Sequence, residues 1–98
     1  MINIINQVFE IEQKLLARKE TFAERNLTRL KHEFEVMGYQ IINPMHRSYQ
    51  VTDTDLDATV SGDAEAGLRV TRVLKPVIYL RAKNDELSLL QKGIVIVE

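Results

Sequence analysis

Residues 2–37 read INIINQVFEIEQKLLARKETFAERNLTRLKHEFEVM, and this stretch decides the fold because it contains neither glycine nor proline. Most of its residues are good helix formers. A first apolar series lies on one face of a helix, at Ile4, Val8, Ile11 and Leu15. A second series with similar spacing follows, at Ala23, Leu27, Leu30, Phe34 and Met37. We therefore predict one long amphipathic helix, ended by Gly38 in a position that favours a left-handed C-cap residue.

The length of this helix predicts a second copy of the chain. The second apolar series is displaced by one residue in heptad phase, a drift that a nearly straight helix shows over about five turns. At about 1.5 Å per residue, the helix would be about 54 Å long, too long for residues 39–98 to cover. We expect residues 1–38 to form a dimerisation helix. Its predicted interface comprises Ile4, Val8, Ile11, Leu15, Phe22, Leu27, Leu30 and Phe34.

Residues 39–98 have a different pattern, which is typical of a small β-domain. Strand candidates are short and regularly spaced, at residues 39–42, 56–60, 68–74, 77–80, 87–91 and 94–97. Turn residues separate them, at 43–44, 61–67, 75–76 and 83–85. This spacing favours an antiparallel sheet or a small β-sandwich over crossover units. The predicted fold class is α+β, one long N-terminal helix followed by a mainly antiparallel β-domain.

Composition narrows the classes of function. The formal net charge of −1 argues against a protein that binds the phosphate backbone of nucleic acid. The chain has no cysteine, so disulfides, thiol nucleophiles and cysteine-based zinc sites are excluded. No stretch approaches the roughly 20 apolar residues of a membrane span, and residues 1–8 lack the features of a signal peptide. We expect a cytoplasmic protein.

No catalytic or metal-binding motif emerges from the residue pattern. Asp53, Asp55 and Asp57 match three positions of a calcium loop, but alanine stands where the loop needs glycine and glutamate, so we interpret them as strand-entry and turn residues. His32 and His46 lack metal-ligand spacing. The serines lack nucleophile-elbow glycines, and there is no glycine-rich phosphate loop. We expect a protein that is not an enzyme and needs no cofactor or metal.

A basic segment forms the remaining candidate surface. Its five cationic residues are Arg69, Arg72, Lys75, Arg81 and Lys83, with no acidic residue between them. Tyr79 is the only aromatic residue among them, which disfavours a stacking platform for bases. Solvent-facing sheet residues or a contact with an acidic protein explain the segment better than nucleic acid does.

The order of these elements resembles the GrpE nucleotide exchange factors. The likeness begins at the helix end, where Gly38 leads into Tyr39-Gln-Ile-Ile-Asn-Pro44, then Tyr49 and the strand Leu56-Asp-Ala-Thr-Val60. It continues through 70–74, 77–80 and 89–97, which look like the last three strands of the GrpE β-domain. The likeness covers about residues 30–98. The family's longer helices and four-helix bundle have no counterpart in this chain.

The resemblance implies a function without covalent chemistry. GrpE proteins are homodimers whose β-domain binds the ATPase domain of a DnaK-type Hsp70 and opens its nucleotide cleft, so that ADP leaves. Such a partner acts by its higher affinity for an open conformer. The resemblance implies that partner-binding residues lie on the surface of the β-domain. Judged by their positions in the chain, they would be Gly38, Tyr49, Lys75, Lys92 and Gly93.

Two other hypotheses about function remain open from the sequence alone. The first is a dimeric, non-catalytic adaptor that presents its β-domain to a different protein. The second is a nucleic-acid-binding module, which would bind DNA or RNA with steep salt dependence. A pull-down with Hsp70 separates the adaptor from the exchange factor, and a mobility-shift assay at low salt tests the nucleic-acid module.

Overall fold

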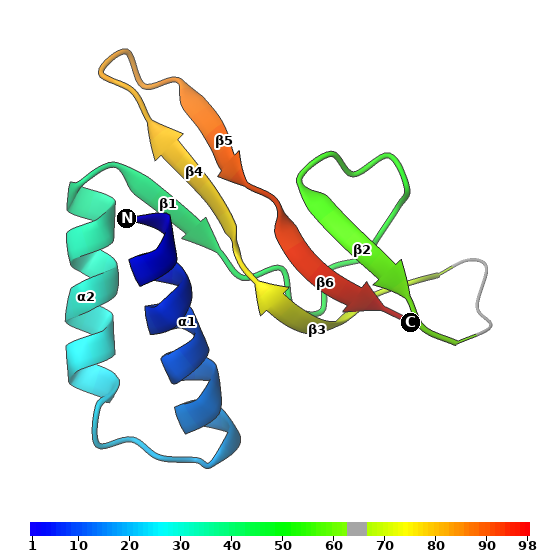
Figure 1. Cartoon of the computed structure of the whole chain (residues 1–98), viewed down its shortest axis with the longest axis horizontal. Helices are drawn as coiled ribbons and strands as arrows, with labels where there is room; N and C mark the ends of the chain where they lie inside the picture. The colour runs from blue at the N-terminus through cyan, green and yellow to red at the C-terminus, as the bar shows by residue number, and fades with distance from the viewer. Residues whose placement is uncertain (63–66) are drawn as a thin grey trace.

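The computed structural model describes residues 1–62 and 67–98 of the chain (Figure 1). Two helices precede six strands among these residues, which confirms the predicted α+β class. The helices are α1 (Ile2–Ala17) and α2 (Glu24–Val36). The strands are β1 (Tyr39–Ile42), β2 (Leu56–Val60), β3 (Val70–Lys75), β4 (Val77–Arg81), β5 (Leu87–Gln91) and β6 (Gly93–Val97). Part of the turn predicted at 61–67 lies outside the described residues.

The predicted long helix is only partly matched, because α1 and α2 are separate helices joined by residues 18–23. Lys19 follows α1 in the left-handed conformation, with a φ of 56°. Its N–H donates to the Leu16 carbonyl at 3.0 Å, and the N–H of Glu20 donates to the Leu15 carbonyl at 2.9 Å. These two bonds make a Schellman motif, with lysine in the position that usually holds glycine.

Burial explains why the chain turns back. Ile5 and Phe9 of α1 are buried in the fold, as are Leu27 and Phe34 of α2. Burying each such side chain stabilises by about 1.5–3 kcal/mol. A left-handed lysine costs about 1–2 kcal/mol, and each lost helical hydrogen bond costs about 1 kcal/mol. The packing gain therefore outweighs the cost of the turn.

The strands form two three-stranded sheets, ordered β1-β4-β5 and β2-β6-β3. Gly38 leads from α2 into the β1-β4-β5 sheet. Its φ is 95°, and its N–H donates to the Glu35 carbonyl at 2.9 Å. This geometry confirms the predicted helix end. The pairings of β1 with β4, β4 with β5, and β3 with β6 are antiparallel, as predicted. The pairing of β2 with β6 is parallel, which the sequence did not indicate.

Two apolar cores meet at β4. The first lies in the β2-β6-β3 sheet and contains Leu56, Val70, Val77, Val95 and Val97. The second lies between the helices and the β1-β4-β5 sheet and contains Ile5, Phe34 and Ile78. Val77 and Ile78 are neighbours on β4, and successive strand residues point to opposite faces. One strand thus contributes to both cores.

A reciprocal pair of amides joins α1 to the sheet. Asn6 Nδ2 donates to Gln91 Oε1 at 2.8 Å, and Gln91 Nε2 donates to Asn6 Oδ1 at 2.9 Å. Gln91 Nε2 also donates to the carbonyl of Pro76 at 2.8 Å. Both side chains are half-buried. The pair therefore fixes the position of α1 along β5.

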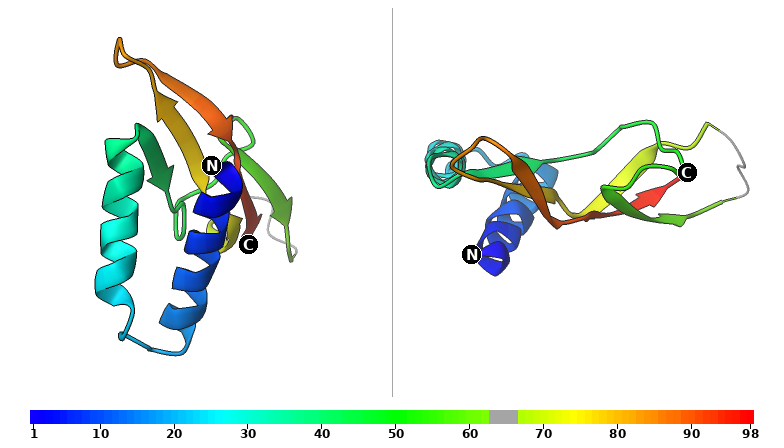
Figure 2. Two further views of the ribbon diagram at one scale, coloured as in Figure 1. Left: turned by 60° about the vertical axis from the view of Figure 1, so that its left-hand side comes forward. Right: turned by 90° about the horizontal axis from the view of Figure 1, so that it is seen from above.

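The molecule is flat, measuring 40 × 39 × 18 Å along its principal axes. Its Cα radius of gyration is 14.6 Å, compared with about 13 Å for a compact chain of this length. Seen from above, the sheets lie in one layer with α1 on one side and α2 beside β1 (Figure 2). None of the described helices is long and apolar enough to cross a membrane.

Candidate protein-interaction surface

One face of the β1-β4-β5 sheet is not covered by any helix of residues 1–62 and 67–98. Ile41 pairs with Ile78 on the face that contacts α1. The neighbouring residues of each strand therefore point to the opposite side. That side, here called the outer face, carries Gln40, Tyr79, Arg81, Leu87 and Leu89, as the cross-strand pairs of the sheet place them together. In the right-hand view of Figure 2, no described helix lies over the upper side of this sheet, opposite α1.

The outer face combines apolar and cationic groups. Leu87 is 44% exposed and Leu89 is 40% exposed, although both are large apolar residues. Tyr79, opposite Leu89, is half-buried, and Arg81, opposite Leu87, is exposed. Aromatic, leucine and arginine side chains on a rigid sheet offer apolar contact area together with hydrogen-bond donors. Such a surface is suited to binding a protein.

A β-bulge in β5 keeps the two leucines on this face. Tyr79 pairs with Leu89, but the adjacent Ile78 pairs with Gln91, so Leu90 is the additional residue on β5. The bulge changes the side-chain alternation, and Gln91 can face α1 while Leu89 faces outward. The same irregularity that forms the Asn6–Gln91 contact thus leaves Leu87 and Leu89 exposed.

The hairpin between β4 and β5 extends the outer face beyond the rest of the sheet (Figure 1). Its turn closes through the N–H of Asp85 to the carbonyl of Ala82 at 3.0 Å and the N–H of Ala82 to the carbonyl of Glu86 at 2.8 Å. Asp85 is left-handed, with a φ of 65°. This arrangement is a type I turn followed by a bulge residue, and it confirms the hairpin loop predicted at 83–85.

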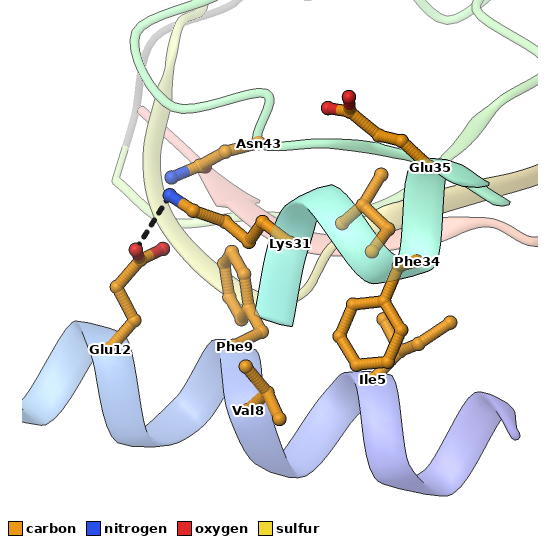
Figure 3. Close-up of a pocket in the computed structure, with 9 residues that line it drawn as sticks. Ile5, Val8, Phe9, Glu12, Lys31, Phe34, Glu35 and Asn43 are labelled. Atoms are coloured by element: carbon orange, nitrogen blue, oxygen red, sulfur yellow. Dashed lines mark hydrogen bonds and ion pairs between the residues drawn. The ribbon is translucent and has the colours of Figure 1, made fainter. Parts of the chain in front are cut away.

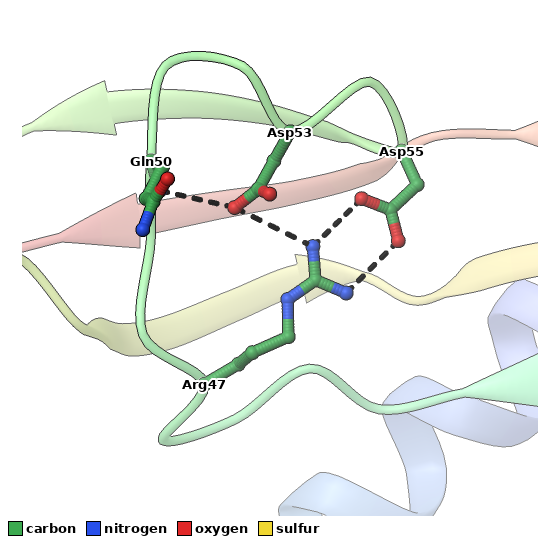
Figure 4. A network of polar contacts seen from close by, with 4 residues as sticks. All are labelled: Arg47, Gln50, Asp53 and Asp55. Carbon is green, nitrogen blue, oxygen red and sulfur yellow. Dashed lines mark hydrogen bonds and ion pairs between the residues drawn. The ribbon is translucent and has the colours of Figure 1, made fainter.

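A polar network orders the loop between β1 and β2 (Figure 4). Arg47 donates two hydrogen bonds to Asp55, at 2.9 and 2.7 Å, and lies 3.9 Å from Asp53. Asp53 also accepts a bond from the backbone N–H of Gln50 at 3.0 Å. The bond from Arg47 lowers the pKa of Asp55, and the same bond raises the pKa of Arg47, with partial burial opposing both changes. Because both shifts favour the charged forms, the pair is suited to holding the loop rather than to proton transfer.

This network gives Asp53 and Asp55, two members of the aspartate run at 53, 55 and 57, a structural role. Asp53 and Asp55 both face Arg47, while Asp57 is exposed on β2. Among residues 1–62 and 67–98, no group of three or more histidine or acidic side chains could hold a metal ion. His46 has a φ of 69° in the same loop, and its backbone N–H donates to the Val70 carbonyl at 3.0 Å.

Three of the predicted partner-binding residues lie close together. The N–H of Gly93 donates to the Asp55 carbonyl at 2.9 Å, and a Cβ added to Gly93 would lie 3.5 Å from the carbonyl oxygen of Lys75. Lys92 precedes Gly93, and both lysines are exposed. This group occupies the junction of the two sheets.

The other two predicted partner-binding residues lie elsewhere. Gly38 is at the opposite end of β4, where its carbonyl accepts a bond from the Arg81 N–H at 2.8 Å. Tyr49 packs against the core of the β2-β6-β3 sheet, and its N–H donates to the Leu68 carbonyl at 2.8 Å. A role for these five residues in partner binding stays a prediction.

The turn at residues 18–23 divides the predicted dimer interface into two parts. Leu27 and Phe34 are buried within the chain, and Val8 and Leu15 are half-buried. The others are exposed: Ile4, Ile11, Phe22 and Leu30, with Phe22 at 77%. The buried members pack internally in this fold, whereas an interface between copies stays a prediction for the exposed ones.

A cavity of about 150 Å³ lies where α1 and α2 meet β1 (Figure 3). Its walls are mainly apolar and include Phe9, Phe34 and Ile41. Lys31 Nζ and Glu12 Oε2, 2.7 Å apart, bridge the two helices beside it. Within one chain, the two helices therefore line a pocket beside an ion pair, and the apolar interface predicted between copies stays a prediction.

Sequence reasoning did not single out the outer face. The alternation Leu87-Ser88-Leu89 is a signal of a strand with one apolar face, but it does not reveal that this face lacks a cover. The predicted basic segment is divided, since Arg72 and Lys75 belong to β3 while Arg81 ends β4 in the other sheet.

Comparison with known proteins gives no relative: no protein-family model, curated protein or solved structure matches this chain.

Proposed function

We propose that the chain is a non-catalytic protein-binding protein that acts as a nucleotide exchange factor for an Hsp70. The observation that carries the proposal is the outer face, where Leu87 and Leu89 are exposed beside Tyr79 on a sheet without a covering helix. An exposed apolar patch on a rigid sheet favours binding of another protein. The resemblance to the GrpE β-domain supplies the partner, the ATPase domain of a DnaK-type Hsp70.

The mechanism needs only differential binding. The outer face would contact the open form of the ATPase domain more strongly than the closed form, which shifts the population toward the open form and releases ADP. A ligand with equal affinity for both forms would shift nothing. The protein would act as a homodimer through its helical half, in the cytoplasm where DnaK-type Hsp70 resides.

Direct binding tests the proposal. Titration of the purified Hsp70 ATPase domain with this protein should give a saturable signal. The double variant Leu87→Ser/Leu89→Ser should weaken the affinity at least about tenfold, as expected for the loss of interface anchors. The control is Leu74→Ser, because Leu74 is 49% exposed but lies on β3 in the other sheet. Equal weakening by the control, or no binding by the unaltered protein, contradicts the proposal.

The short helical hairpin favours a second candidate, a dimeric adaptor for another protein. The helices are 16 and 13 residues long, shorter than the paired stems that the resemblance implies. The adaptor would use the same outer face without affecting nucleotide release. Capture of a partner that depends on Leu87 and Leu89, together with no affinity for Hsp70, would support the adaptor.

A further inference from the structure

The turn between α1 and α2 is formed by residues with no intrinsic preference for a turn. Residues 18–23 read RKETFA and contain no glycine, proline, asparagine or aspartate. Arginine, lysine, glutamate and alanine are among the better helix formers. Lys19 nevertheless adopts a φ of 56°, a conformation that is unfavourable for residues with a Cβ. The local sequence therefore favours helix, while the fold requires a turn.

The turn also leaves large apolar side chains exposed. Phe22, within the turn, is 77% exposed, and Leu16, in the last turn of α1, is 62% exposed. These residues contribute nothing to either apolar core. If residues 18–23 became helical, Lys19 would leave its unfavourable conformation and the turn would gain helical hydrogen bonds.

The contacts that hold α1 on the sheet do not depend on the turn. They comprise the packing of Ile5 against Ile78 and Phe34, the Asn6–Gln91 amide pair and the Glu12–Lys31 ion pair. An α1 helix from another copy can form all of them with the same geometry. Opening the turn therefore loses no packing if a second copy supplies α1.

We propose that two copies of this chain form a domain-swapped dimer in which residues 2–36 are one continuous helix and each α1 packs on the sheet of the other copy. This proposal builds on the homodimer proposed above and adds how it forms. Exchange of identical elements through a strained hinge is a low-cost route to a dimer. The two long helices run antiparallel, because α1 and α2 are antiparallel in the hairpin (Figure 1).

The ion pair between the helices locates the symmetry axis. Glu12 contacts Lys31 at 2.7 Å within one chain, and in the dimer Glu12 of one copy contacts Lys31 of the other. The two-fold axis then passes midway between positions 12 and 31, beside Thr21 and Phe22.

Crosslinking of cysteines tests which chain supplies α1. The protein has no cysteine of its own, and the Glu12→Cys/Lys31→Cys variant replaces an ion pair whose loss costs little at the surface. A short bismaleimide should join the two positions between chains in the dimer fraction isolated by size-exclusion chromatography, and within one chain in the monomer fraction. Denaturing electrophoresis separates the two products.

One substitution should shift the equilibrium between monomer and dimer. Lys19→Gly makes the left-handed turn favourable and should raise the dimer dissociation constant about tenfold or more. Its control is Lys14→Gly, which weakens the same helix in both arrangements. Sedimentation over a range of concentrations gives these constants.

Each contrary outcome has a distinct meaning. A dimer that gives only within-chain crosslinks overturns the swap but leaves the proposed homodimer intact. A monomer at every concentration overturns both. Neither result bears on Hsp70 binding by the outer face, which the titration of the ATPase domain decides separately.

Discussion

At the scale of single residues, Arg47 and Asp55 order the loop that follows β1. Their two hydrogen bonds lower the pKa of the Asp55 carboxyl below its ordinary value of 3.8. A carboxylate with a lowered pKa in the folded state stabilises the fold above its unfolded pKa, and this contribution disappears as the pH falls through the folded value. The contribution of the Asp55 carboxylate to the free energy of unfolding should be complete above about pH 5 and diminish below about pH 4.

We predict that Asp55→Asn lowers the free energy of unfolding at pH 7 by up to about 1 kcal/mol, because solvent partly screens this pair. The difference from the unaltered protein should shrink at pH 3. Urea unfolding at both pH values measures it. Lys14→Ala serves as control, because the Lys14–Glu10 pair, at 3.4 Å, is exposed on both sides. An Asp55→Asn difference that is the same at both pH values would refute the assignment.

Gly93 shows how one residue limits the distance between strands. A Cβ at this position would lie 2.9 Å from Leu56 Cδ2 and 2.9 Å from Val77 Cγ2, both in the first core. We predict that Gly93→Ala lowers the free energy of unfolding by about 1–3 kcal/mol through overpacking. Thermal unfolding measures the loss. A Gly93→Ala variant as stable as the unaltered protein would contradict the packing explanation.

Some residue roles followed from the sequence and others did not. Gly38 was recognisable as a helix end because glycine after a long apolar series is a common C-cap. Lys19 was not, because nothing in a lysine side chain signals a left-handed turn. Arg47 gave no signal either, since its contact with Asp55 depends on a loop path that spacing does not reveal.

At the scale of elements, the amide pair between Asn6 and Gln91 determines how α1 sits on the sheet. Removing one amide leaves the other half-buried without its partner, which costs about 1–3 kcal/mol. We predict that Asn6→Ala and Gln91→Ala are each destabilising, and that the double variant costs less than the sum. A double-mutant cycle measured by urea unfolding should give a coupling of about 1 kcal/mol. Strict additivity would show that the pair contributes no joint stabilisation.

The helices illustrate why the boundaries of elements could not be predicted from the sequence. Both apolar series were correctly assigned to helices, apart from Ala23 and Met37, which lie just outside α2, because their periodicity is local. The turn between them arises from burial of Ile5 and Phe34 against Ile78, three residues that are distant in the sequence. A contact of that kind overrides local helix preference and leaves no mark in the residues of the turn. The parallel pairing of β2 with β6 was missed for the same reason.

At the scale of the whole molecule, a flat chain with two small cores presents a large surface for its volume. The molecule measures only 18 Å along its shortest axis. One side of the β1-β4-β5 sheet carries α1, and the other presents the outer face (Figure 2). The class of fold and the order of elements could be predicted from apolar periodicity, whereas the uncovered face required knowledge of which strands pair.

The central claim, that this chain opens the nucleotide cleft of an Hsp70, is tested most directly by the rate of ADP release. Stopped-flow fluorescence with a labelled ADP bound to the Hsp70 ATPase domain measures that rate as this protein is added. We predict a saturable acceleration of release, which is lost in the Leu87→Ser/Leu89→Ser variant and retained in Leu74→Ser. A release rate that stays unchanged at saturating protein would contradict the claim.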